Sequence, residues 1–331
     1  MAGFPLARSG GATATREHGQ ARRQQVQDRT FHALTLLFAV LVLLILGGII
    51  VSLVDGALPA LRKFGLGFVG STAWNPVKEN FGAWPAIYGT LVTSAIAMLV
   101  GVPVSFGIAL FITELCPPWL KRPLGIAIEL LAGIPSIIYG IWGLFAFAPF
   151  MQSTVQPALI DTIGEVPWIG DLFQGPPYGI GVLTAGIILA VMVLPFVTSV
   201  TRDVFETVPP MLRESAYGLG ATTWEVVWRI VLPFSRVGVV GGVMLGLGRA
   251  LGETMAVTFV IGNAHRVSTS LLAPGTTISA SIANEFTEAV GALYTSSLVA
   301  LGLILFVITF VVLALARLML ARMNARAWGL K

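Results

Sequence analysis

The feature that most constrains this chain is a series of six long apolar runs separated by short polar connections. A helix needs about 20 mostly apolar residues to cross the hydrocarbon core of a bilayer, and each run has that length. Only 11% of the residues are charged, against about 25% in soluble globular proteins. Lipid satisfies no backbone hydrogen bonds, so the spanning elements must be helices or a closed barrel. We therefore predict an all-α integral membrane protein whose six transmembrane helices cover residues 31–54, 86–113, 124–147, 178–200, 237–262 and 296–316.

The Lys and Arg residues gather in alternate connections of this pattern. They are frequent before the first run, after the second and fourth runs, and after the sixth. Because basic residues favour the cytoplasmic side, both termini and the connection 202–236 are expected in the cytoplasm. The predicted organisation is then a tail (1–30), a first helix with an external interfacial segment (31–86), a core of five helices (87–318) and a second tail (319–331).

The connection 202–236 has the features of two short helices joined by a tight turn. Gly220 can take the positive φ angle that ends a helix. Thr222 or Thr223 can then cap the next helix, with Glu225 in its first turn. Such a hairpin suits docking into a groove of a soluble partner. The alternative is an ordinary connector packed against the membrane surface.

Within this connection, Glu214-Ser215-Ala216 is followed by Gly220 and then by Ile230-Val231-Leu232-Pro233. This spacing resembles the EAA loop of bacterial ABC-importer permeases, with Ser in place of the usual second Ala. The resemblance implies a type I importer (MetI-like) fold and a coupling helix that docks into an ATPase subunit. The residues that it assigns to this coupling loop are Glu214, Ser215, Ala216, Gly220, Ala221, Thr222, Trp224 and Pro233.

The run from Gly246 to Val257 resembles the phosphate-specific importers in particular. It is more similar to their PstC-type permease than to their PstA-type permease. The segments Gly133–Gly140, Trp74-Asn75-Pro76 and Asn284-Glu285-Phe286 agree with it. It implies a bacterial inner-membrane subunit that transports inorganic phosphate by alternating access. The implied partners are a PstA-type permease, two ATPase subunits, an external phosphate-binding protein and membrane lipid. This chain would bind no cofactor, because ATP and Mg would be used by the ATPase.

Arg249 and Glu253 interrupt the fifth apolar run four residues apart, so a continuous helix would place them on one face, able to pair. A charge within a span usually faces protein or a water-filled path, and the Arg fork of donors suits phosphate oxygens. We therefore place both residues on the translocation path. The alternative is a structural ion pair that holds helices together; a pair that opens and closes during transport would reconcile the two interpretations.

Other polar residues give weaker indications. Ser136 and Tyr139, beside Pro135, can offer donors to the translocation path, or can satisfy the backbone groups that the proline frees. Glu129 can line the path, or sit near the cytoplasmic end and pair with Lys121 or Arg122. Glu285 and Glu288 are expected to be solvated charges or contacts to a binding protein.

Several classes of function are disfavoured. The only cysteine, Cys116, and three scattered histidines provide no zinc-binding spacing, and no nucleophile and base stand out. The basic residues flank apolar spans rather than forming a nucleic-acid surface. The glycines of 246–252 lack nucleotide-loop spacing, and Gly242/Gly246 and Gly248/Gly252 instead suit helix packing. The remaining alternatives are an ABC importer of another oxyanion (sulfate, molybdate or a phosphonate) and an ion-coupled secondary transporter, although no convincing internal repeat supports the latter.

Overall fold

The computed structural model describes the backbone of residues 11–327 and the side chains of residues 27–322. Contacts divide the chain into two compact units, one ending at Asp55 and the other starting at Gly56. In the described residues, the first unit is a single helix, because α1 runs from Gly11 to Phe64 and ends in the second unit. This helix contains the predicted first span and extends beyond it at both ends.

The second unit is helical except for one small hairpin. Its four long helices are α3 (Trp84–Leu110), α8 (Val182–Glu206), α11 (Leu232–Gly252) and α14 (Ala292–Ala327). The short α-helices are α2 (Gly67–Gly70), α4 (Pro118–Ala132), α5 (Ser136–Trp142), α6 (Ala148–Phe150), α7 (Gln156–Ile163), α9 (Pro210–Gly218), α10 (Thr223–Val226), α12 (Met255–Val260) and α13 (Ile278–Glu285). The remaining elements are the π-helical turns η1 (Phe111–Leu115), η2 (Gly143–Phe147), η3 (Met151–Val155) and η5 (Val227–Val231), the 3-10 turn η4 (Gly170–Leu172), and the strands β1 (Trp74–Asn75) and β2 (Asn80–Phe81).

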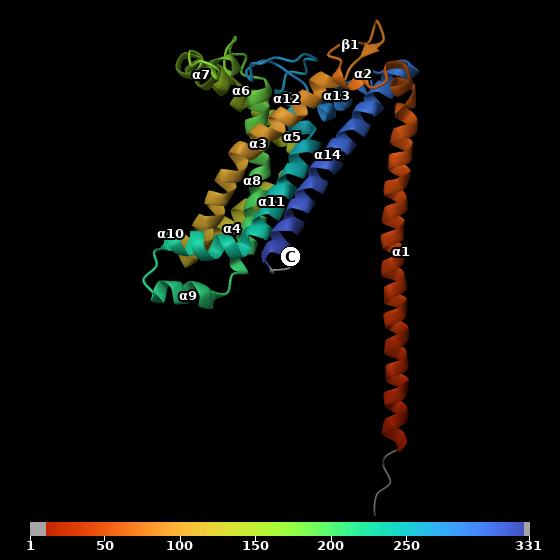
Figure 1. Ribbon diagram of the computed structural model, residues 1–331, viewed down its shortest axis with the longest axis vertical. Coiled ribbons are helices and arrows are strands. Elements are labelled where there is room, and N and C mark those ends of the chain that lie inside the picture. Colours follow the sequence, from red (N-terminus) through yellow and green to blue (C-terminus); the bar gives the residue numbers. More distant parts are fainter. Residues whose placement is uncertain (1–10, 328–331) are drawn as a thin grey trace, which may run out of the picture. The chain divides into compact units, whose positions relative to one another are not determined.

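Six helical stretches of the described chain are long and apolar enough to cross a membrane. This confirms the predicted all-α class and number of spans. In the second unit, α3 packs along α8, and α11 packs against α8 and α14 (Figure 1). A Cβ atom on Gly242 or Gly246 would lie within 3 Å of the α8 side chains Val200 and Val197, respectively. These glycines therefore let α11 approach α8 closely, as predicted.

The predicted boundaries of the third span are wrong. Helix α4 ends at Ala132, and a break at Gly133–Pro135 precedes the membrane-spanning stretch, which runs from Ser136 to Ile163. Pro135 has no N–H, and its ring disfavours a helical conformation in the residue before it. The apolar composition continues across this break, so hydropathy alone merged α4 with the start of the following helix.

All four π-helical turns in the described residues have a proline two positions after their last residue. Pro117, Pro149, Pro157 and Pro233 follow η1, η2, η3 and η5 in this way. A proline ring clashes with the carbonyl four residues earlier in an α-helix, and a widened turn moves that carbonyl away. The widened turns before Pro149 and Pro157 therefore explain how the stretch from Ser136 to Ile163 remains helical although it contains two prolines.

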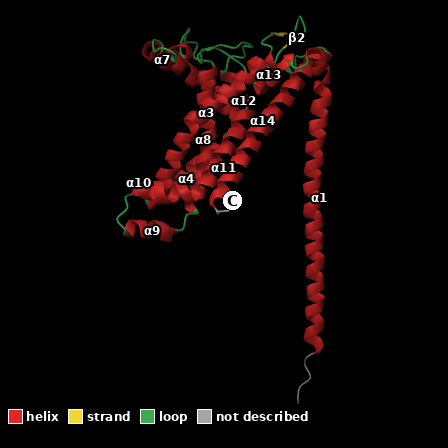
Figure 2. Cartoon of the chain, viewed as in Figure 1, coloured by secondary structure: helices red, strands yellow, loops and turns green. Residues whose placement is uncertain are grey.

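The two ends of the second unit carry different structures. Helices α9 and α10 lie at one end, and the β1–β2 hairpin, α7 and α13 lie at the other (Figure 1). The longer loops of the unit lie at the same end as the β1–β2 hairpin (Figure 2). In the hairpin, Trp74 pairs with Phe81 and Asn75 with Asn80. The predicted coupling segment and the predicted external segments are thus at opposite ends of the helices.

Candidate coupling hairpin and transport path

The turn between α9 and α10 is fixed by two adjoining capping motifs. The Gly220 N–H donates to Tyr217 O (2.9 Å), and the Ala221 N–H donates to Ala216 O (3.0 Å), with Gly220 at φ +86°. This is the Schellman pattern, in which a residue of positive φ ends the helix. Thr222 then starts α10 through a capping box with Glu225. The sequence predicted the turn at Gly220 and a cap at Thr222 or Thr223; the structure places the cap at Thr222.

Helix α9 has no buried residue. Glu214 and Ser215 are exposed, and the Glu214 carboxylate forms no hydrogen bond or ion pair with any residue that the structure describes. Apolar side chains are also exposed here, with Leu219 at 91% and Trp224 at 68%. The Trp224 ring packs edge-on against Trp228 at 5.2 Å between centroids. The hairpin therefore presents a mixed apolar and acidic surface.

The base of the hairpin is anchored in a small apolar core. Val226 and Val231 are fully buried with Phe205, from the end of α8. Ala216 and Ala221, the two residues that the Schellman motif joins, pack against the same cluster. A hollow of about 330 Å³ is lined by Ala216, Leu219, Gly220, Ala221, Glu225, Val226, Arg229 and Ile230. Pro233 is exposed beyond it and follows the π-helical turn η5.

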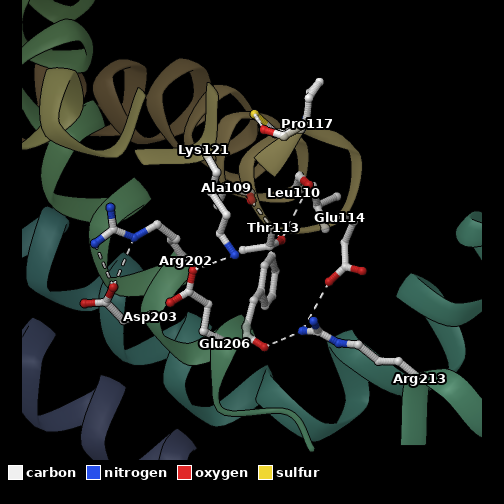
Figure 3. Close-up of polar contacts among 12 residues, drawn as sticks. Ala109, Leu110, Thr113, Glu114, Pro117, Lys121, Arg202, Asp203, Glu206 and Arg213 are labelled. Atoms are coloured by element: carbon white, nitrogen blue, oxygen red, sulfur yellow. Dashed lines mark hydrogen bonds and ion pairs between the residues drawn. The ribbon is translucent and has the colours of Figure 1, made fainter. Parts of the chain in front are cut away.

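Two ion pairs join α4 to α8 near the same end of the molecule. Lys121 Nζ lies 3.0 Å from Glu206 Oε1, and Arg202 Nη2 lies 3.0 Å from Glu129 Oε1. Arg202 also contacts Asp203, its neighbour in the chain (Figure 3). The expected partners of Glu129, in the connection after the second span, are therefore wrong. Its partner comes from the fourth span.

The expected pairing of Arg249 with Glu253 is also wrong. Helix α11 ends at Gly252, and Glu253 has extended backbone angles, so the two residues do not share a continuous helical face. Glu253 is buried; its Oε1 accepts the Ala256 N–H (3.3 Å), and its backbone carbonyl accepts the Ser279 hydroxyl (2.7 Å). Glu253 is thus held by hydrogen bonds from α12 and α13 rather than by Arg249.

Arg249 is exposed and forms no ion pair within the part of the chain that is described. Its guanidinium lies over the Phe196 ring, 4.3 Å from the centroid, which is cation–π geometry. Tyr139 is buried and donates to Leu131 O at 2.9 Å, so it satisfies a carbonyl just before the Pro135 break. Ser136, half-buried, is the first residue of α5.

The two interrupted helices of the second unit touch one another. Helix α5 starts after the break at Pro135, helix α12 starts after the break at Glu253, and the two pack together. A Cβ atom on Gly140 would lie 2.8 Å from the Phe259 ring and 3.1 Å from Ala256 Cα. Discontinuous helices that meet in this way are typical of substrate sites in membrane transporters.

The expectation of a solvated Glu285 is wrong. Its Oε2 accepts Trp74 Nε1–H (2.8 Å) and the Tyr294 hydroxyl (2.5 Å), and its Oε1 is bonded to His265 Nε2. The His265 ring stacks on Trp74 with centroids 4.6 Å apart. Burial alone would raise the pKa of the Glu285 carboxyl, but these hydrogen bonds outweigh it and lower that pKa. Trp74 and Glu285 stood out in the sequence, but no local signal joined residues so far apart.

Six apolar helical stretches, two touching helix breaks and an exposed helical hairpin define the class of polytopic membrane transport proteins. The sequence pattern of the binding-protein-dependent transport system inner membrane component family matches residues 101–325. The chain belongs to this family.

Relatives and solved structures agree with this assignment. Two relatives are named phosphate transport system permease protein PstC. The one from Mesorhizobium japonicum is 66% identical to this chain over 92% of this chain and 93% of the relative. The one from Haemophilus influenzae is 57% identical over 90% of this chain and 94% of the relative. A bacterial alginate ABC transporter has a similar fold, with a TM-score of 0.57 at 22% identity over 87% of this chain and 94% of that one. The MetNI methionine ABC transporter has a TM-score of 0.53 at 16% identity, over 72% of this chain and 94% of the chain in that structure.

Proposed function

We propose that this chain is the permease subunit of an ATP-driven, binding-protein-dependent importer of inorganic phosphate in a bacterial inner membrane. The observation that carries the proposal is the 66% identity, over nine-tenths of both chains, to a protein named as a phosphate transport permease. The exposed α9–α10 hairpin supports it, because a permease without an ATP site of its own must receive force from another subunit.

The hairpin is the proposed contact with the ATPase. Glu214, Ser215 and Trp224 are exposed on it, and the capping motifs at Gly220 and Thr222 make it a rigid body. ATP and Mg would be bound by two ATPase subunits, while a second, PstA-type permease would complete the membrane channel. Movement of the hairpin would then switch this channel between its outward-open and inward-open forms.

The proposed orientation places the hairpin and both termini in the cytoplasm. The basic residues Lys121, Arg202 and Arg213 gather at the end of α8 that leads into the hairpin, where Lys121 pairs with Glu206 and Arg213 contacts the Phe205 carbonyl, in agreement with the positive-inside rule. The β1–β2 hairpin and the Glu285 cluster would then face the outside, where a phosphate-binding protein delivers its substrate.

The proposed path for phosphate passes Arg249 and the two helix breaks. Arg249 keeps its charge without a carboxylate partner in the described chain, which leaves its donors available to an anion. Tyr139 lies in α5, just after the first break, and Ser136 and Glu253 mark the two breaks. In this arrangement, Arg249 attracts the anion while Glu253 holds the backbone break open.

The test is ATPase activity and anion uptake of the complete complex, reconstituted in vesicles with its binding protein. The assay compares phosphate with sulfate, molybdate and phosphonates. Stimulation by phosphate alone would support the proposal. Stimulation by another oxyanion would retain the importer and overturn its substrate. If no ATPase co-purifies with the chain, the coupling role of the hairpin is wrong.

A further inference from the structure

The exposed helix α9 has one charged side chain that turns inward. Arg213 has a side-chain exposure of 21%, although α9 has no buried residue. The next residue, Glu214, is exposed and without a partner in the described chain. Two neighbouring residues of the same helix thus face different ways, Glu214 toward the surroundings and Arg213 toward the transmembrane helices.

Arg213 contacts the ends of two transmembrane helices at once. Its Nη2 donates to the Phe205 carbonyl at the end of α8 (2.6 Å). The same nitrogen lies 3.2 Å from Glu114 Oε1, in the π-helical turn that continues α3 (Figure 3). Among the described residues, α3 and α8 form the most extensive contact between two helices, and Arg213 joins α9 to both of them.

Glu114 is an unusual anchor because its side chain is only 5% exposed. A buried carboxylate needs a charged or hydrogen-bonding partner, and Arg213 is its only ion-pair partner in the described chain. The contact is close, but it lacks hydrogen-bond geometry: neither Glu114 Oε1 nor Arg213 Nε has a hydrogen-bond partner among the described residues. A small rotation of α9 would therefore be enough to tighten or break the contact.

From this geometry we propose that Arg213 is a positioning residue that transmits movement of α9 to α3 and α8, with Glu114 as its buried anchor. The inference rests on the proposed function, because it assigns the step between the ATPase and the channel. Force applied to the outward face of α9 reaches α8 through the Phe205 carbonyl and reaches α3 through Glu114. Without this link, α9 can move with the ATPase while the transmembrane helices do not follow.

The experiment measures phosphate uptake and ATP hydrolysis in the same vesicles, using the complete complex with its binding protein. The variants are Arg213→Met, Glu114→Gln and the double variant, and the control is Arg236→Met, an exposed arginine just after the hairpin. Each variant at the link is expected to lower the phosphate moved per ATP by about fivefold or more, the usual lower range of coupling between sites. The double variant should lose no more than Arg213→Met alone, because Arg213→Met already removes the contacts with both the Phe205 carbonyl and Glu114, whereas Glu114→Gln removes only the second. The control should keep the wild-type ratio.

A purely structural role gives a different result. Arg213→Met leaves the buried Glu114 carboxylate without its ion-pair partner, and Glu114→Gln leaves the partly exposed Arg213 without one. Both variants would then lower thermal stability, but the uptake-to-hydrolysis ratio of the folded complex would stay at the wild-type value. That result would overturn the proposal, as would additive losses in the double variant. If the wild-type complex moves another oxyanion instead of phosphate, only the substrate assignment fails. The ratio of uptake to ATP hydrolysis is then measured with that anion for the wild type and for each variant. A wild-type complex that hydrolyses ATP but moves none of these anions would overturn both proposals.

Discussion

Replacing Gly220 by alanine should weaken docking of the ATPase without unfolding the protein. Gly220 has φ +86°, and a Cβ atom there would have no neighbour within 4 Å. The cost is therefore backbone strain alone, about 1–2 kcal/mol for an L-residue in the left-handed region. If docking requires this turn, affinity for the ATPase should fall about 5–30-fold.

The same helix end provides a matched control. Gly218 is the last residue of α9, has no positive φ angle, and also has open space at its Cβ position. Ala at that position should leave docking unchanged, or strengthen it slightly through the helix preference of alanine over glycine, about 0.5–1 kcal/mol. Gly220→Asn should lie between wild type and Gly220→Ala, because asparagine tolerates the left-handed region better.

The assay titrates the purified ATPase against the permease pair in detergent and compares dissociation constants. Thermal unfolding of the permease is measured in parallel, to show that the variants are folded. Equal affinities for Gly220→Ala and wild type would refute the argument that the turn must keep its positive φ angle. Equal losses for Gly218→Ala and Gly220→Ala would refute the assignment of the cost to that angle.

Three further predictions concern packing, protonation and transport. Gly89→Ala should lower the free energy of unfolding by at least about 3 kcal/mol, the upper range for overpacking, because the new Cβ would lie 1.8 Å from Thr276 O. The yield of folded protein measures this loss, and Gly107→Ala, which has open space at its Cβ position on the same helix, is the control. Folding lowers the pKa of Glu285 from its ordinary 4.5, so the ionised carboxylate stabilises the protein above that pH, and this stabilisation should be lost as the pH falls through the folded-state pKa. Thermal unfolding measured between neutral and acidic pH should show this loss in the wild-type protein. Glu285→Gln should be less stable at neutral pH and should show a flatter dependence on pH. Arg249→Gln should greatly reduce phosphate uptake, and full uptake by this variant would remove Arg249 from the proposed path.

The sequence could predict those features of the fold that local chemistry determines. The number of spans follows from apolar length, and the turn at Gly220 and the cap at Thr222 follow from residue type and spacing. The positive φ angle and the capping box are both present. Each of these features needs only neighbouring residues for its formation, so one stretch of sequence contains the whole signal.

The errors arose where distant residues or backbone breaks decide the structure. Arg249 and Glu253 have helical spacing, but the helix ends between them at Gly252, and their spacing cannot reveal that end. Glu285 obtains its donors from Trp74, His265 and Tyr294, which come from three other segments. Such contacts depend on the packing of whole helices, which local composition does not determine.

The pairing of each π-helical turn with a proline has a consequence for how these helices present their faces. A π-helical turn contains one residue more than an α-helical turn, and one residue corresponds to about 100° of rotation about the helix axis. Beyond η2 and η3, the faces of the stretch from Ser136 to Ile163 are therefore out of phase with those before it. Deleting one residue within such a turn, together with replacement of its proline by alanine, should close the turn into an α-helix and restore the phase. A natural chain can thus re-aim half of a membrane helix by gaining one residue and one proline, with no change in the sequence of either half.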